Sequence, residues 1–154
     1  MMNIDICAIN LSDGDEIAAA CAVERANLCT AWSEAAIKEC EKSDSIRYLV
    51  AKDGGVVGIC SFALVFGEGQ LINIAVAKTY QRSGIGSMLL EAAIKMAADN
   101  EAEQLSLEVE ADNTKAIDFY KKHQFVIAGT RKSFYGEGRD AVCMIKSITK
   151  EKRV

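Results

Sequence analysis

The sequence predicts a single α/β domain, built as a mixed β-sheet with helices on its faces. One observation is its size, because 154 residues with 50% hydrophobic and 26% charged side chains suit one globular domain. A second is the alternation along the chain of segments with strand periodicity and segments with helix periodicity. The third is a helix between the fourth and fifth strands, which implies a parallel pair with a right-handed crossover.

The chain begins with a strand and two helices. Residues 3–9 alternate apolar and polar side chains, which is typical of a strand. A Ser-Asp pair then offers an N-cap for an alanine-rich helix over 17–28, and Ser33 caps a short helix from 34 to about 42. These signals place the first two helices before the main hairpin of the sheet.

Three antiparallel strands follow. The sequence Asp53-Gly54-Gly55 is a strong hairpin signal between strands 46–52 and 56–65. Gly67-Glu68-Gly69 then turns the chain into a strand over 70–77. The remaining elements are a loop over 78–83, a long helix over 84–98, a strand over 105–110, a helix over 113–123, and a closing hairpin of 125–135 and 141–148 around Gly136-Glu137-Gly138.

We expect one domain over residues 1–149 and a basic tail over 150–154, without repeats or linkers. The net charge of −4 argues against a nucleic-acid partner. No apolar run approaches the ~18 residues of a membrane span. The N-terminus lacks the basic and apolar regions of a signal peptide, so we expect a cytoplasmic protein without membrane partners.

The charge is unevenly distributed. Residues 1–80 hold six Lys/Arg and eleven Asp/Glu, net −5, while residues 81–154 hold twelve and eleven, net +1. The second half can therefore receive an anionic ligand, and the first half could steer a cationic peptide. An ordinary acidic surface is the alternative interpretation.

The six cysteines are scattered, with no C-x-x-C pair, and the chain has a single histidine. A zinc site needs clustered ligands, so we expect no metal. The pattern instead favours small buried apolar side chains in a reducing compartment. A cysteine nucleophile would have only His123 as its partner, and we set that hypothesis aside.

The most informative segment is 81–87, Gln-Arg-Ser-Gly-Ile-Gly-Ser, between a strand and the long helix. A helix start offers unpaired N–H groups and about half a positive charge, glycines allow close approach, and Arg82 adds a cation. The Rossmann motif would need a third glycine at Leu89, and the P-loop ending with its Mg²⁺-coordinating Ser/Thr is absent, which excludes a nucleotide switch. A pyrophosphate cradle and a ligand-free turn both remain open on these residues.

Gln-Arg-x-Gly-x-Gly after a strand resembles the coenzyme A signature of the GNAT N-acetyltransferases, and the resemblance continues over more than half the chain. It is closest to the RimI type, the ribosomal-protein-alanine N-acetyltransferases. The resemblance implies the GNAT fold, a mixed, mostly antiparallel sheet of about seven strands flanked by about four helices. The segments that carry it are Asn73–Val76, Leu107–Asn113, Ala116–Tyr120, Trp32-Ser33 and Arg139-Asp140-Ala141 with Met144.

The resemblance also implies an acetyl-CoA co-substrate, direct transfer in a ternary complex, and roles for particular residues. Glu108 matches the general base and Tyr120 the general acid. Main-chain groups of Ile74, Ala75 and Val76 would hold the acetyl and pantetheine portions, and Asn113 would contact the pantetheine arm. The pyrophosphate would be wrapped by Arg82, Ser83, Gly84, Ile85, Gly86 and Ser87.

The residue chemistry agrees with such a reaction. On strand 105–110, Glu108 and Glu110 share one face. A strand inside a sheet covered by helices should be almost entirely apolar, so two carboxylates on one face indicate that this face lines a cleft. The alternative is that the strand lies at a solvated edge of the sheet. A backbone α-amine, with a pKa near ~7.8, is about one-tenth neutral at pH 7, whereas a lysine near ~10.4 needs roughly 4.6 kcal/mol for deprotonation. A single acidic base therefore favours an N-terminal amine.

We therefore expect the acceptor to be a peptide or protein N-terminus, such as that of a small-subunit ribosomal protein. A small-molecule amine or a lysine is the alternative within the same class. A non-catalytic acyl-CoA-binding sensor is the alternative from another class, and the presence of both Glu108 and Tyr120 counts against it.

Two positions depart from the family pattern. Gln124 stands where the family has glycine, and a left-handed residue there costs roughly 1 kcal/mol without glycine, so we expect that turn to differ. Gly136 stands where the closest relatives have proline, in a loop that shapes the peptide site. Lys121, Lys122 and His123 suit the C-terminus of their helix electrostatically.

Overall fold

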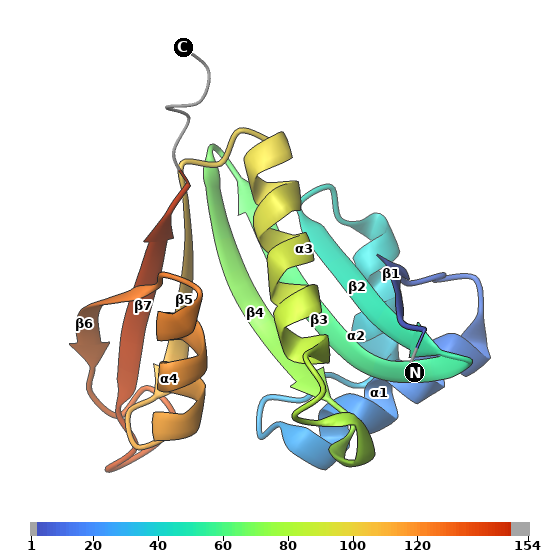
Figure 1. The fold of residues 1–154 in the computed structure, drawn as a ribbon, viewed down its shortest axis with the longest axis horizontal. Helices are drawn as coiled ribbons and strands as arrows, with labels where there is room; N and C mark the ends of the chain where they lie inside the picture. Colours follow the sequence, from blue (N-terminus) through green and yellow to red (C-terminus); the bar gives the residue numbers. More distant parts are fainter. Residues whose placement is uncertain (1–2, 149–154) are drawn as a thin grey trace.

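Seven strands form one sheet in the order β1-β2-β3-β4-β5-β7-β6, and the computed structural model describes residues 3–148 (Figure 1). The strands are β1 Asp5–Ala8, β2 Ile46–Asp53, β3 Gly55–Val65, β4 Glu68–Val76, β5 Gln104–Glu110, β6 Val126–Arg131 and β7 Ala141–Ser147. The helices are α1 Gly14–Asn27, α2 Glu34–Glu39, α3 Ile85–Asp99 and α4 Thr114–Lys122, with 3-10 turns at Cys40–Lys42 and Lys78–Tyr80.

The order of elements confirms the predicted α/β fold, and several boundaries differ by one to four residues. The first helix begins at Gly14, earlier than predicted, because the Asp13 carboxylate caps it by accepting from the N–H groups of Asp15 and Glu16. Strand β6 ends at Arg131, earlier than predicted, and a loop leads from it to β7. The expected basic tail at 150–154 lies outside the described residues.

Two cores cover the two faces of the sheet. Alternate residues of β2 point to opposite sides, so that Leu49 and Ala51 pack with α3 and α4, whereas Tyr48 and Val50 pack with α1 and α2. In Figure 1, α3 and α4 accordingly lie on one face, with α1 and α2 behind the sheet. Strands buried on both faces explain the near-continuous apolar runs of β2 and β3.

The predicted parallel pair is β4 with β5, and it is short. The two strands pair only at Glu68–Gln70 against Gln104–Ser106 and then diverge, so the sheet opens as a V (Figure 1). Beyond this point β4 stays with β3, and β5 stays with β7. Gly69 sits where the strands meet, and an added Cβ would lie 2.8 Å from Leu105 Cδ1. The opening of the V faces the start of α3 and the N-terminal end of α4.

The cysteine expectation holds for Cys21, Cys40 and Cys60, which are buried, and is wrong for Cys29, which is exposed. No helix within residues 3–148 is both long and apolar enough to cross a membrane.

Candidate active site

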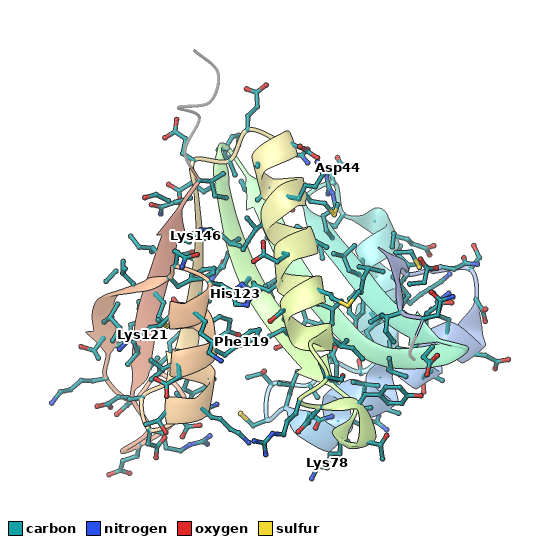
Figure 2. All side chains as sticks on the ribbon, viewed as in Figure 1. Asp44, Lys78, Phe119, Lys121, His123 and Lys146 are labelled. Carbon is teal, nitrogen blue, oxygen red and sulfur yellow. The ribbon has the colours of Figure 1, made fainter. Side chains whose placement is uncertain are left out.

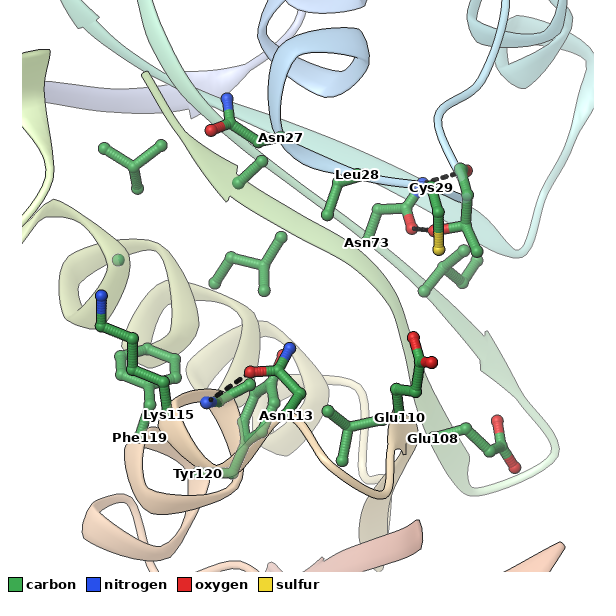
Figure 3. A pocket seen from close by; sticks show the side chains of 18 of the residues that line it. Asn27, Leu28, Cys29, Asn73, Glu108, Glu110, Asn113, Lys115, Phe119 and Tyr120 are labelled. Carbon is green, nitrogen blue, oxygen red and sulfur yellow. Dashed lines mark hydrogen bonds between the residues drawn. The ribbon is translucent and has the colours of Figure 1, made fainter. Parts of the chain in front are cut away.

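A cavity of about 550 Å³ lies where β4 and β5 separate (Figure 3). Its walls come from the α1–α2 loop, β4, the start of α3, β5, α4 and the β6–β7 loop. The predicted site residues that line it are Ile74, Ala75, Val76, Arg82, Gly86, Glu108, Asn113 and Tyr120. Residues distant in the sequence therefore meet in one space.

Four of the predicted residues do not line this cavity. Gly84 is the N-cap of α3, with φ of +89°, and Ile85 is buried in the core. Ser83 hydrogen-bonds through its hydroxyl to the Tyr80 carbonyl, and Ser87 contacts His123. What these residues offer toward the cavity side of α3 is therefore their main chain.

The start of α3 is suited to an anion. Within the described residues 3–148 no side chain caps this helix, and its first turn contains no acidic residue. The first N–H groups of a helix have no partner within it and carry the positive end of the helix dipole. Arg82 and Lys115 line the same cavity and add positive charge. Because Gly86 has no side chain, the backbone of α3 comes close to the Phe119 ring: a Cβ added at Gly86 would lie 3.6 Å from it. An extended anionic ligand fits this end.

Strand β4 presents main-chain groups to the cavity. The Ala77 N–H donates to the Val57 carbonyl at 2.8 Å, so the backbone groups of Ala77 face β3. Because backbone groups alternate in direction along a strand, Ile74 and Val76 face away from β3 and toward the opening of the V. The Gln81 amide donates to the Val76 carbonyl at 2.9 Å.

The two carboxylates of β5 share the cavity face, as expected, and they differ in their partners. Glu110 accepts from Arg139 at 2.8 and 3.0 Å, and this pairing lowers the pKa of Glu110. Among residues 3–148, the contacts of Glu108 are all long: Gln70 at 3.4 Å, Arg131 at 3.7 Å and the Cys143 thiol at 3.9 Å. The side chain of Glu108 is 16% exposed. Glu108 is thus the carboxylate better placed to accept a proton.

Tyr120 lies on α4 and is 7% exposed. Burial raises its pKa far above the ordinary range, and Cys60 and Tyr135 add to the shift. Rings of Phe119 and Phe125 hold it edge-on at 5.3 and 5.7 Å. Within residues 3–148 its hydroxyl has no hydrogen-bond partner, so a neutral phenol is available as a donor to a bound molecule.

Asn113 is the N-cap of α4, and its side-chain oxygen accepts from the Ala116 N–H at 3.1 Å (Figure 3). Its amide N–H₂ group is left to donate to a ligand in the cavity. The cap therefore fixes the direction of a possible ligand contact.

A buried polar network behind β4 was missed by the sequence reasoning. Glu24 on α1 is fully buried and accepts from the Trp32 N–H at 2.8 Å and from Asn73 Nδ2 at 3.1 Å, and the Tyr48 hydroxyl donates to its other oxygen. Thr30 donates to Asn73 Oδ1 at 2.8 Å. The network fixes the α1–α2 loop, whose Leu28 and Cys29 line the cavity.

A signal for Glu24 was present. Ile17, Ala20 and Cys21 precede it at the spacing of one helix face and are buried, so Glu24 falls on the apolar stripe of α1. A carboxylate in such a position requires buried donors.

Gln124 corrects an expectation. It adopts φ of +69°, and the turn is the one that glycine would form: the Phe125 N–H donates to the Tyr120 carbonyl at 3.1 Å and the Gln124 N–H to the Lys121 carbonyl at 3.0 Å. The left-handed conformation is kept at the cost of strain. Gly136 has φ of +126°, which proline cannot adopt, so the β6–β7 loop here does differ from a proline-bearing one.

A V-shaped sheet, with an uncapped helix start beside the cavity between its diverging strands, is the arrangement that the resemblance to the GNAT N-acetyltransferases implies. The chain belongs to the acetyltransferase (GNAT) family, whose model matches residues 12–125. It is similar to ribosomal protein bS18-alanine N-acetyltransferase of Escherichia coli, with 32% identity over 121 residues, 77% of this chain and 82% of that protein.

Solved structures agree with this assignment. The ribosomal-protein-S18-alanine N-acetyltransferase from Escherichia coli superposes with a TM-score of 0.84 at 27% identity, covering 96% of each chain. Arabidopsis thaliana NAA60 in complex with acetyl-CoA gives a TM-score of 0.83 at 18% identity, over 95% of this chain and 99% of that one, and this likeness shows the fold alone.

Proposed function

We propose that this enzyme transfers the acetyl group of acetyl-CoA to the α-amino group of a peptide or protein N-terminus, by direct transfer in a ternary complex. The observation that carries the proposal is that the start of α3, the edge of β4 that faces away from β3, Glu108 and Tyr120 all border one cavity. A cofactor whose diphosphate binds at the start of α3 would thus place its thioester near Glu108 as the base and Tyr120 as the acid.

Acetyl-CoA as co-substrate would supply the acetyl thioester, and the lining of the cavity offers groups for each of its parts. Arg82 and the main chain of Ser83, Gly84, Ile85, Gly86 and Ser87 would hold the pyrophosphate, since the helix start lacks a cap and an acidic residue. Ile74 and Val76 would pair with the pantetheine amides in the manner of a strand, flanking Ala75. The free amide of Asn113 would donate to the same arm.

The chemical step forms a C–N bond and breaks a C–S bond. The acceptor amine attacks the thioester carbonyl, and Glu108 takes its proton directly or through one water. Tyr120 donates its phenolic proton to the departing thiolate sulfur, and solvent restores both groups afterwards. Glu110 is less suited to act as the base because Arg139 engages both of its oxygens.

An N-terminal acceptor is favoured by proton chemistry. An α-amine with a pKa near ~7.8 needs little help to become neutral, whereas a lysine near ~10.4 would need roughly 4.6 kcal/mol at pH 7. The similarity to ribosomal protein bS18-alanine N-acetyltransferase supports the N-terminus of a small-subunit ribosomal protein as that acceptor. The net charge of −5 over residues 1–80 suits a cationic peptide.

Glu108→Gln and Tyr120→Phe test the assignment. Each variant should keep acetyl-CoA binding and lose turnover, by about 10²-fold or more, in an assay of thiol release. Glu110→Gln is the matched control on the same face of β5 and should lose less. Unchanged rates in both variants would contradict the catalytic roles, and binding without turnover in the wild type would favour a sensor.

The cofactor half is tested separately. Arg82→Ala should weaken acetyl-CoA binding in calorimetry, and an unchanged dissociation constant would count against the pyrophosphate cradle. A panel of N-terminal peptides, free lysine and small amines would then identify the acceptor class.

A further inference from the structure

Arg139, in the loop between β6 and β7, contacts three parts of the chain with one side chain. Its Nε and Nη2 donate to the two oxygens of Glu110 on β5, at 2.8 and 3.0 Å. Its Nη1 donates to the Tyr135 carbonyl of its own loop at 3.2 Å. Its Nη2 also lies 3.9 Å from the thiol sulfur of Cys29, in the loop between α1 and α2. A single guanidinium thus connects β5 and the β6–β7 loop to the α1–α2 loop.

The three partners of Arg139 all line the cavity. Figure 3 shows Cys29, Glu108 and Glu110 on one side of it. Burial raises the pKa of Tyr135, and the nearby charges of these same three residues add to the shift, so the Tyr135 ring lies close to them. We call this side of the cavity, formed by Cys29, Glu108, Glu110 and Tyr135, the acceptor end.

The opposite side of the cavity is the one suited to the diphosphate. Lys115 and Phe119 lie there (Figure 3), and Phe119 points from α4 toward the start of α3 (Figure 2). With the diphosphate bound on that side and the thioester near Glu108, the remaining approach for an amine is through the acceptor end. We therefore expect the first residues of a peptide acceptor to lie between the α1–α2 loop and the β6–β7 loop.

Arg139 also reaches from one arm of the V to the other. The α1–α2 loop is held to β4 by the contacts of Asn73 with Glu24 and Thr30, whereas β5 and β7 form the other arm. The strands β4 and β5 pair over only three positions and then separate. Arg139 and Cys29 thus meet across the opening, beyond the point where strand pairing joins the two arms.

The Glu110–Arg139 pair determines a direction more than it adds stability. A guanidinium that engages both oxygens of a carboxylate has a defined orientation. The Arg139 side chain is 47% exposed, and a pair exposed to this degree contributes little to folding. The base of the loop is held separately, because the Ala111 N–H donates to the Asp140 carbonyl at 2.8 Å. Loss of the Arg139 guanidinium should therefore loosen the loop around Tyr135 without unfolding the domain.

Resting on the proposed function, we propose that Arg139 is a positioning residue for the acceptor: by binding Glu110 and the Tyr135 carbonyl, it holds the β6–β7 loop and the Tyr135 ring at the acceptor end. Its contacts are with the walls of the acceptor end, so it determines where the peptide lies and takes no part in the chemical step. Its removal should therefore affect binding of the acceptor and leave binding of acetyl-CoA unchanged.

Charge alone predicts the opposite result. An α-amine with a pKa near ~7.8 is mostly cationic at pH 7. Removing the Arg139 cation and leaving Glu110 unpaired would strengthen the attraction of that amine to the acceptor end, so the KM for the acceptor would fall. Positioning predicts that this KM rises, because a loop that is no longer held presents the Tyr135 ring in many orientations. The direction of the change separates the two explanations.

The test is steady-state kinetics with acetyl-CoA and an N-terminal peptide of ribosomal protein bS18. Arg139→Gln should raise the KM for the peptide by about tenfold or more, while kcat and the KM for acetyl-CoA change by less than about threefold. Its midpoint in urea should stay close to that of the wild type. Arg139→Lys keeps the charge without the planar fork, so its KM for the peptide should lie between the two.

Lys132→Gln is the matched control, because it removes a cation from the same loop. Lys132 is exposed and makes no ion pair within residues 3–148, so its loss should not raise the KM for the peptide.

An exchange of charges tests the ion pair itself. Glu110→Arg and Arg139→Glu each place like charges opposite one another, so each should raise the KM for the peptide. The double variant restores a pair of opposite charges, and its KM for the peptide should be lower than that of either single variant.

A KM for the peptide that is unchanged or lower in Arg139→Gln would overturn the inference and leave the proposed function intact. An equal rise in the KM for acetyl-CoA, an equal effect of Lys132→Gln, or a double variant no better than the single ones would do the same. Failure of the wild type to acetylate this peptide and every other N-terminal peptide of the panel would overturn the proposed function together with the inference.

Discussion

Replacing Glu24 with alanine should destabilise this protein severely. The change removes the acceptor of three donors: the Trp32 N–H, the Tyr48 hydroxyl and one hydrogen of the Asn73 amide, whose nitrogen also donates to the Thr30 carbonyl at 3.2 Å. An unsatisfied buried polar group costs about 1–3 kcal/mol, so the sum is roughly 3–9 kcal/mol, comparable to the whole stability of an ordinary domain. We expect Glu24→Ala to fold poorly or to unfold at much lower denaturant concentration.

Glu24→Gln provides a variant that should remain folded. Its amide oxygen can still accept from Trp32 and Asn73, and its N–H₂ group can donate to the Tyr48 hydroxyl, which then acts as an acceptor. The loss is limited to the charge assistance of these bonds, about 1–2 kcal/mol.

The assay is urea unfolding of the wild type and both variants, followed by steady-state kinetics of Glu24→Gln. Because the network fixes the α1–α2 loop, this variant should raise the KM for the acceptor more than the KM for acetyl-CoA. A loss below about 1 kcal/mol in Glu24→Ala would refute the reasoning, since the three donors would then have found other partners.

Three further predictions concern the frame of the site. Gln124→Gly should raise the free energy of unfolding by about 1 kcal/mol in denaturant melts, because glycine adopts the left-handed turn without strain; a loss of stability would contradict the strained turn. Gly69→Ala should cost about 1–3 kcal/mol in the same assay, because its Cβ would meet the buried Leu105, and an unchanged midpoint would contradict this close approach. Burial raises the pKa values of Tyr48 and Tyr120, so the folded state binds more protons than the unfolded state above pH ~10, and stability should be complete below that pH and fall as it rises further; a flat profile in pH-dependent melts would disprove the shift.

Local patterns in the sequence were enough to predict the order of the elements and to single out segment 81–87 as a candidate ligand-binding segment. The hairpin signal Asp53-Gly54-Gly55 sufficed for β2 and β3, because a tight turn between two apolar runs indicates an antiparallel pair of strands. Alternation placed Glu108 and Glu110 on one face of β5, and the cavity lies on that face.

Contacts between distant segments could not be predicted in the same way. Glu24 meets Asn73 across 49 positions, and Ser87 meets His123 across 36. Neither contact produces a periodic pattern in the sequence, because each depends on how two distant elements pack against one another. The shortness of the β4–β5 pairing is a further example: the crossover helix predicts a parallel pair, and it does not predict that the strands separate after three positions.

The central claim is that Glu108 and Tyr120 transfer acetyl from acetyl-CoA to a free N-terminal amine. Mass spectrometry of a small-subunit ribosomal protein's N-terminal peptide, incubated with acetyl-CoA and the enzyme, tests it most directly. We predict a single acetyl increment on the α-amine, strongly reduced with Glu108→Gln or Tyr120→Phe and absent with a peptide whose N-terminus is already blocked. Acetylation of the blocked peptide on a lysine, or equal acetylation by the wild type and both variants, would contradict the account.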